Sequence, residues 1–126
     1  MSHGTVCWSE CVTRDVAATK AHYGAVCGWT FTDQPMDGFT YTMAMLGDVP
    51  VCGIMDLAAL DSPGVEPHWM TYLAVDDIEA AVAASDRTGG RTIRPPFEVA
   101  GVGQFAIVQE PGGAVAGLLQ PAAELG

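Results

Sequence analysis

Basic residues are scarce in this chain of 126 residues. Five lysines and arginines stand against fifteen aspartates and glutamates, so the formal net charge is −10. Nucleic acids and anionic membrane surfaces are bound through clusters of basic side chains. The composition therefore argues against both partners and permits a neutral or cationic ligand. The same acidic excess also serves simply to keep an apolar chain in solution.

Long apolar runs are absent as well. No stretch approaches the roughly 18 residues that a membrane-spanning helix needs, and residues 1–4 lack the basic start and apolar core of a signal peptide. Hydrophobic residues nevertheless make up 49% of the chain, which speaks against disorder. We therefore expect a single folded domain over residues 1–126, located in the cytoplasm.

The cysteines are few and form no CxxC pair. They are Cys7, Cys11, Cys27 and Cys52. If Cys7 and Cys11 share a strand, about 13 Å separates them at roughly 3.3 Å per residue, which is too far for a disulfide. We expect reduced thiols that are buried as small hydrophobic groups. A thiol nucleophile is the alternative, although no histidine partner lies nearby in the sequence.

An internal repeat organises the chain. Residues 8–15 align with residues 70–77 so that Asp15 falls on Asp77. Without any gap, the alignment also places Gly28 on Gly90. Repeats of this length indicate one supersecondary unit that occurs twice.

The end of the repeat sets the boundaries of the two units. Residues 51–55 match residues 115–119 after a small shift. The first unit is therefore expected over residues 5–57 and the second over residues 68–121. A linker rich in turn residues, 58–67, joins them.

Each unit has the same local pattern. Asp15 is placed to cap a helix that Gly28 ends, and Asp77 is placed to cap a second helix that Gly89 and Gly90 end. Alternating and apolar segments predict strands around the helices. The expected strands are residues 6–13, 29–32, 39–45 and 50–55 in the first unit. In the second unit they are the segment that aligns with the first strand, followed by residues 91–93, 104–109 and 114–119.

The order strand–helix–strand–strand–strand therefore occurs twice. This predicts an α+β fold of two tandem βαβββ units. One such unit cannot cover both faces of its own short sheet. We expect the two units to pair into a curved, cup-shaped mixed sheet that carries the helices on its outer face.

The order and spacing of several short motifs resemble the vicinal oxygen chelate superfamily, which is also called the glyoxalase, bleomycin-resistance and extradiol dioxygenase superfamily. The motifs are Trp8-x-Glu10, Thr13-x-Asp15, Tyr23, Gly28-Trp29, Val75-Asp-Asp77, Gly89-Gly90, and Glu110-Pro-Gly-Gly-Ala114 followed by Gly117. The resemblance covers nearly the whole chain and implies the paired βαβββ cup. It also implies pairing of two cups, so we expect a homodimer.

The resemblance further implies where a metal would bind. Metal-dependent members hold one divalent ion through the first and last strands of each unit, and the corresponding positions here are Trp8, Gly53, Met70 and Gly117. Indole, thioether and glycine do not replace the imidazole and carboxylate ligands of such ions. His3, His22 and His68 lie outside these positions. We therefore place the chain in a metal-free branch and expect no cofactor.

Strand alternation places aromatic side chains and methionines around those positions. A set of this kind suits a planar aromatic or polyketide-like small molecule, although ordinary core packing is the alternative for each member. The candidate ligand-binding residues are Trp8, Glu10, Phe39, Tyr41, Met43, Gly53, Met55, Met70, Tyr72 and Gly117.

Glu10 is the one ionisable residue that we place in this wall. Unpaired and half-buried, it would have a raised pKa and could act as a general base or contact a cation. It could instead pair with an arginine or cap backbone groups. Tyr41 and Tyr72 are candidate proton donors, whereas Trp29 and Trp69 are expected to pack against helices.

Two functions remain open at this point. The first is a binding protein that sequesters a natural product, of the self-resistance type. The second is a metal-independent enzyme of secondary metabolism, resembling a cyclase, isomerase or hydroxylase, in which Glu10 and a tyrosine act as acid and base. The residues favour binding and do not identify the ligand.

Overall fold

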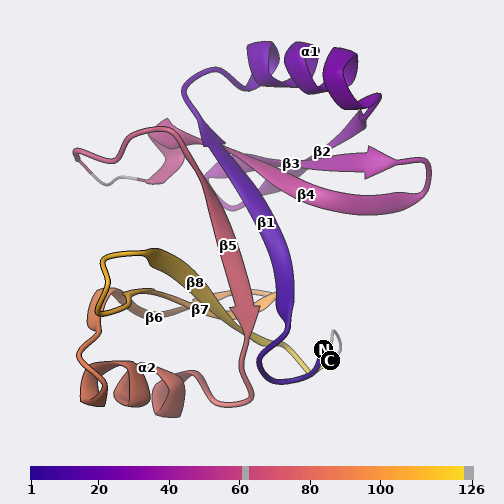
Figure 1. The fold of residues 1–126 in the computed structure, drawn as a ribbon. Coiled ribbons are helices and arrows are strands. Elements are labelled where there is room, and N and C mark those ends of the chain that lie inside the picture. Colours follow the sequence, from indigo (N-terminus) through magenta and orange to yellow (C-terminus); the bar gives the residue numbers. More distant parts are fainter. Residues whose placement is uncertain (61–62, 124–126) are drawn as a thin grey trace. The chain divides into compact units, whose positions relative to one another are not determined.

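The computed structural model describes residues 1–60 and 63–123 and has an α+β fold (Figure 1). Two βαβββ units follow one another along the chain. Their strands form a mixed eight-stranded sheet in the order β2-β3-β4-β1-β5-β8-β7-β6. The elements are β1 (Val6–Thr13), α1 (Val16–Cys27), β2 (Thr30–Met36), β3 (Phe39–Leu46), β4 (Val49–Asp56), a 3-10 helix (Leu57–Leu60), β5 (His68–Ala74), α2 (Ile78–Arg87), β6 (Arg91–Val99), β7 (Gly103–Gln109) and β8 (Val115–Pro121).

The chain divides into two compact units. The first unit is Trp8–Met70, and the second unit is Met1–Cys7 together with Thr71–Gly126. The two expected βαβββ repeats are therefore confirmed. A single domain and a cup-shaped pairing stay predictions.

Both helices begin as the sequence predicts. The carboxylate of Asp15 accepts a hydrogen bond of 3.0 Å from the backbone N–H of Ala18, and Asp77 accepts one of 3.1 Å from Ala80. Helix α1 stops at Gly28, which adopts the left-handed conformation with φ of 73°. Neither helix in the described part of the chain has the length and apolar character needed to cross a bilayer.

Two strands run four or more residues past their expected ends, and both contain proline. β6 continues from Arg91 to Val99, and β2 reaches Met36. Proline has no backbone N–H to donate to a neighbouring strand, so its presence in a sequence argues against a strand. A strand at the edge of a sheet nevertheless accommodates proline. β2 and β6 both stand at the ends of the strand order, and the prolines of β6 lie at a shift of register against β7 between Arg94 and Phe97. A 3-10 helix, Leu57–Leu60, occupies the start of the segment that was expected to be an irregular linker.

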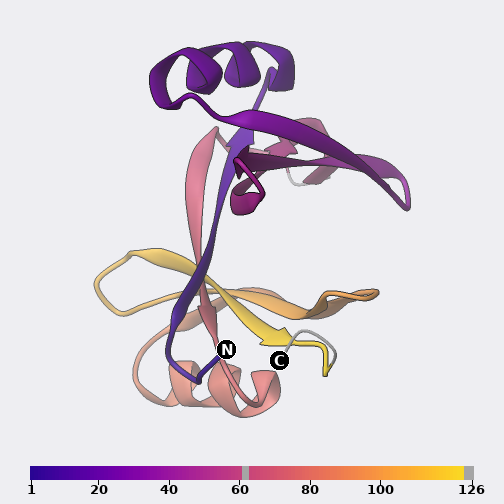
Figure 2. The ribbon, with the colours of Figure 1, turned by 90° about the vertical axis from the view of Figure 1, so that its right-hand side faces the viewer.

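In the first unit, α1 lies along one side of strands β2 to β4 (Figure 2). Phe31 of β2 lies under Gly24 of the helix, and it is paired with Ala44, which is fully buried. Ala44 is in turn paired with Cys52. The opposite face of these strands is therefore free of α1.

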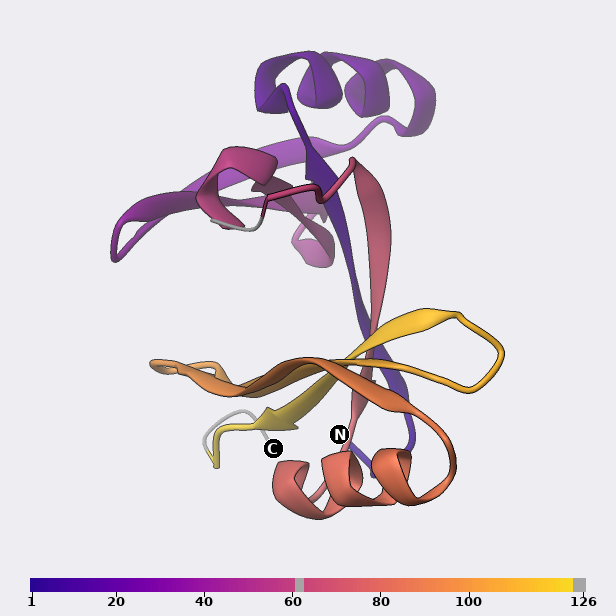
Figure 3. The ribbon, with the colours of Figure 1, turned by 90° about the vertical axis from the view of Figure 1, so that its left-hand side faces the viewer.

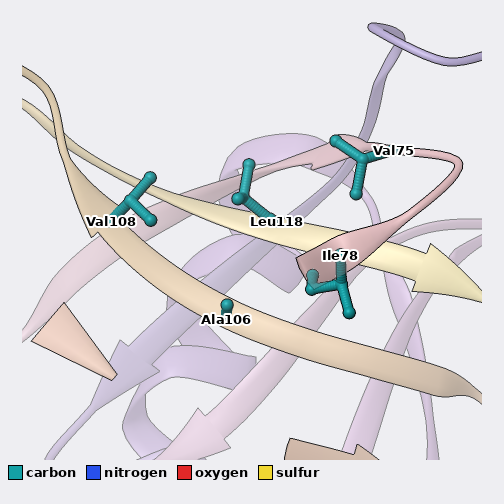
Figure 4. Packing of buried hydrophobic residues seen from close by; sticks show 5 residues of the cluster. All are labelled: Val75, Ile78, Ala106, Val108 and Leu118. Atoms are coloured by element: carbon teal, nitrogen blue, oxygen red, sulfur yellow. The ribbon is translucent and has the colours of Figure 1, made fainter. Parts of the chain in front are cut away.

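In the second unit, α2 packs against β6, β7 and β8 (Figure 3). Ile78, at the start of the helix, is 1% exposed. The side chains around it form one apolar cluster of Val75, Ile78, Ala106, Val108 and Leu118 (Figure 4). Because side chains alternate along a strand, residues 105, 107, 117 and 119 lie on the other face.

The cysteines are free thiols, as predicted, but not all of them are buried. Cys11 and Cys52 are buried, Cys7 is half-buried and Cys27 is exposed. Burial raises the pKa of Cys52 to about 11, and burial also raises the pKa of Cys7 and of Cys11. Cys27 lies at the last position of α1, where it is exposed.

We expect one cysteine to react far faster than the others with iodoacetamide at pH 8. Only thiolates are nucleophilic, and a pKa near 11 leaves about one Cys52 side chain in a thousand ionised at that pH. Mass spectrometry of timed samples should find the first label on Cys27. The Cys27→Ser variant should lose the fast phase, whereas first labelling of Cys52 in the native protein would contradict the structure.

Candidate functional site

The candidate residues of the first unit gather on the face of the strands that lacks α1. Glu10 of β1 is paired with Gly53 of β4, and Gly53 is paired with Met43 of β3. Val12 and Met55 form the next pair of β1 and β4 on the same face. Strand alternation therefore places a carboxylate, a glycine and a thioether side by side, as the sequence predicts.

An indole–phenol pair is the most specific contact on this face. The Trp8 Nε1–H donates a hydrogen bond of 3.0 Å to the Tyr41 hydroxyl. That hydroxyl lies directly above Gly53, where a Cβ at residue 53 would overlap it. Trp8 and Tyr41 are both half-buried. The glycine thus makes room for a phenol that is held by the neighbouring indole.

Glu10 stands at the centre of this group. It is half-buried and opposite Gly53, the residue that Tyr41 covers. Its negative charge also raises the pKa of the adjacent Cys11, after the larger effect of burial. Glu10 is therefore the cross-strand partner of the same glycine that the Tyr41 phenol covers.

Phe39 takes a different place. It lies at the start of β3 and lines a pocket of about 460 Å³ on the first unit. Lys20, Asp33 and Thr42 also line that pocket. Lys20 donates a 3.0 Å hydrogen bond to Asp33, and Thr42 donates one of 2.8 Å, so the pKa of Asp33 is lowered.

Two further candidates belong to the second unit. Tyr72 of β5 is paired with Gly117 of β8. The ring covers the glycine so closely that a Cβ at residue 117 would overlap Cδ1 and Cε1 of Tyr72. Tyr72 is buried, at 9% exposure. Met70, at the end of the first unit, is buried as well.

The residues at the four implied metal positions do not fit a divalent ion. They offer an indole, a thioether and two glycines, and none of these is a nitrogen or oxygen ligand of the kind such ions take. A tyrosine ring lies on each glycine. Across residues 1–60 and 63–123, no three His, Cys, Asp or Glu side chains are grouped closely enough to hold a metal ion.

Sequence reasoning missed part of the second unit's face. The Phe105 ring contacts Tyr72 edge-on at 5.5 Å between centroids, and Phe97 stacks on Phe105 at 5.7 Å. Phe105 and Ile107 are two positions apart in β7, so strand alternation could have placed both on one face of the sheet. Phe97 lay beyond the expected strand because of the prolines before it.

The two remaining tryptophans lie elsewhere in the first unit, beside Tyr23 of α1. The Trp29 and Trp69 rings are 5.3 and 5.7 Å from the Tyr23 ring between centroids. Both therefore pack against a helix residue, as the sequence predicts. Trp69 keeps 46% of its surface exposed.

Comparison with known proteins agrees with this fold. Over 125 residues, the chain is 34% identical to a putative glyoxylase, CFP32, from Mycobacterium tuberculosis, covering 98% of this chain and 48% of the relative. It is 33% identical over 95 residues to the anthracycline biosynthesis protein DnrV from Streptomyces peucetius, covering 75% of this chain and 34% of that protein. The chain thus spans half or less of the length of these relatives.

A solved structure gives the same result for the fold. A methylmalonyl-CoA epimerase from Streptomyces coelicolor, in complex with 2-nitronate-propionyl-CoA, superposes with a TM-score of 0.66 at 16% identity, with 97% of both chains covered. The family model for the Glyoxalase/Bleomycin resistance protein/Dioxygenase superfamily matches residues 8–116. The chain therefore belongs to that superfamily.

Proposed function

We propose that this protein binds a planar aromatic or polyketide-like small molecule without a metal ion, and sequesters it. The observation that carries the proposal is the Trp8–Tyr41 pair above Gly53. Where the family resemblance implies metal ligands, the first unit carries a half-buried indole and a glycine covered by a phenol ring.

The chemistry of this face supports an aromatic ligand. Rings of Trp and Tyr present large, flat and rigid surfaces with a polar edge. Met43 lies on the strand of Tyr41 and Met55 on the strand of Gly53, and thioether side chains adapt to the outline of a ligand. The relative DnrV is named for anthracycline biosynthesis, and an anthracycline is a planar, fused-ring polyketide.

Met70, Tyr72 and Gly117 remain proposed ligand-binding residues by the repeat. Each corresponds to a residue of the first unit: Met70 to Trp8, Tyr72 to Glu10 and Gly117 to Gly53. A homodimer and a cytoplasmic location also stay predictions.

A second function is supported by one observation. Glu10 is paired with Gly53 across the strands, and the Tyr41 hydroxyl lies above Gly53. A carboxylate base and a phenol donor at one place could move a proton between a carbon and a neighbouring carbonyl oxygen. In that case the protein is a metal-independent isomerase or cyclase of secondary metabolism, with Tyr72 as a further candidate donor.

The Glu10→Gln variant separates the two functions. If the protein only binds, the affinity for the cationic probe 2-(aminomethyl)anthraquinone should fall about three- to tenfold, because a charge contact on the ligand is lost. Affinity for neutral anthraquinone-2-carboxamide should stay within twofold of the wild-type value. Titration calorimetry measures both affinities.

The same variant has a different effect if the protein is an enzyme. The wild-type protein would then accelerate exchange of the C10 protons of anthrone in D₂O, which proton NMR follows. Glu10→Gln would abolish this acceleration while the affinity for anthrone stays near the wild-type value. Absence of exchange in the wild-type protein would remove support for acid–base chemistry, and failure of all three probes to bind below 1 mM would reject the proposed ligand class.

A further inference from the structure

Three aromatic rings and one arginine form a continuous row in the second unit. Tyr72 meets Phe105 edge-on, Phe105 stacks on Phe97 at an interplanar angle of 23°, and Arg94 ends the row. The guanidinium carbon of Arg94 lies 3.7 Å from the centre of the Phe97 ring. We call these four residues the aromatic row.

The row lies on the face of the strands that α2 does not cover. Phe97 is paired with Phe105, Phe105 with Leu119, and Tyr72 with Gly117. The side chains packed around α2 belong to the alternate positions, Ala106, Val108 and Leu118. Phe97 and Phe105 are half-buried and Arg94 is exposed, so the row is accessible at its arginine end.

The charge on this face is opposite to that of the chain. The chain carries fifteen acidic and five basic residues, yet the registers place two arginines and no carboxylate here. The residues on this face are Tyr72, Ala74, Arg91, Arg94, Phe97, Val99, Gly103, Phe105, Ile107, Gln109, Val115, Gly117, Leu119 and Pro121.

Arg94 differs from Arg14, Lys20 and Arg91, whose N–H groups already have polar partners. Arg14 pairs with Glu66, Lys20 with Asp33, and Arg91 donates a 3.2 Å hydrogen bond to Gln109. Within residues 1–60 and 63–123, Arg94 forms no ion pair or side-chain hydrogen bond, and its guanidinium contacts the Phe97 ring. In an acidic protein, an arginine that rests on an aromatic ring and not on a carboxylate keeps its N–H groups available for an anion.

The geometry suits one class of anion. A guanidinium stacked on a ring is held flat, and its N–H edge then matches a carboxylate through two parallel hydrogen bonds. Phe97 and Phe105 continue the same surface with π faces for the body of a ligand. A planar aromatic acid would therefore satisfy both the charge and the rings.

We infer that the aromatic row binds an aromatic carboxylic acid, with Arg94 on its carboxylate and Phe97 and Phe105 along its rings. The inference specifies the chemical class of the ligand and rests on the proposed function in that the ligand is planar and aromatic. It assigns to Arg94 a specificity role that neither the repeat nor the family motifs indicate.

The experiment compares anthraquinone-2-carboxylate with the neutral anthraquinone-2-carboxamide by titration calorimetry at pH 7.5. The wild-type protein should bind the carboxylate about tenfold tighter than the amide. Arg94→Gln should abolish this preference by raising the Kd of the carboxylate about tenfold and leaving that of the amide within twofold. Phe97→Leu should weaken the binding of the carboxylate.

Arg87→Gln is the matched control, because it removes the same charge from the last turn of α2 and leaves the row intact. It should keep the preference for the carboxylate. Loss of the preference in Arg87→Gln as in Arg94→Gln, or its persistence in Arg94→Gln, overturns the inference. Equal binding of both probes by the wild-type protein also overturns it and leaves the proposed function standing, whereas no binding of either probe below 1 mM rejects both.

Discussion

Replacing Trp8 with alanine should weaken the binding of anthraquinone-2-carboxamide by roughly 10- to 100-fold. Loss of an aromatic stacking partner together with its buried surface removes on the order of 1–3 kcal/mol. The indole is half-buried and its nitrogen bonds to the Tyr41 hydroxyl. The substitution therefore also releases Tyr41 from its position above Gly53. Titration calorimetry gives the affinity.

Trp8→Phe separates stacking from the hydrogen bond. Phenylalanine keeps a ring at this position but cannot donate to Tyr41, so its loss of affinity should be smaller than that of alanine. Circular dichroism should confirm that both variants keep the native fold. An affinity of Trp8→Ala within twofold of the wild-type value would contradict the proposed role of Trp8.

Tryptophan fluorescence gives an independent check on the same residue. Quenching by the probe should vanish in Trp8→Phe and persist in Trp69→Phe, because Trp69 lies beside Tyr23 and not with the candidate residues. If Trp69→Phe loses the signal instead, the ligand binds on the helix side of the first unit. That outcome would remove Trp8 and Glu10 from the site.

The parts of the fold that the sequence predicts well have strong local signals. Asp15, Asp77 and Gly28 occupy positions that only a few residue types satisfy, and all three cap helices as expected. Strand alternation correctly placed Glu10, Met43 and Gly53 in one row. These features depend on residues close in the sequence or on a period of two, so the chain alone specifies them.

The parts that were missed depend on contacts between distant residues. No local pattern indicates that the Tyr41 hydroxyl bonds to Trp8, which is 33 positions away. The aromatic row was not predicted for a related reason: Pro95 and Pro96 interrupt the strand pattern before Phe97. The cysteines show a third kind of failure: Cys27 is apolar enough for a core, yet it ends a helix and is exposed.

The two glycines at implied metal positions have a common structural role. Gly53 lies under Tyr41 and Gly117 under Tyr72, and in each case a β-carbon would overlap the phenol ring or its hydroxyl. The absence of a side chain therefore has a physical reason that is separate from the absence of a metal ligand. Each glycine lets a tyrosine side chain approach the strand backbone closely.

Gly117→Ala should accordingly destabilise the protein and displace Tyr72. The new methyl group would overlap the body of the ring at Cδ1 and Cε1, so the whole ring must move and its edge-on contact with Phe105 is lost. Overpacking of this kind costs about 1–3 kcal/mol. Urea unfolding should show a lower midpoint with an unchanged m-value, and the affinity for anthraquinone-2-carboxylate should fall with it.

Gly24→Ala is the matched control, because a β-carbon there would make ordinary contacts of 3.7 and 3.8 Å with Trp29 and Phe31. Alanine also favours a helix over glycine by up to about 1 kcal/mol, so this variant should be at least as stable as the wild type. The double variant Gly117→Ala/Tyr72→Leu should recover part of the lost stability, since the smaller side chain relieves the overlap. Full stability of Gly117→Ala alone, with an unchanged near-ultraviolet tyrosine signal, would show that Tyr72 does not lie on Gly117 and would remove the first ring of the aromatic row.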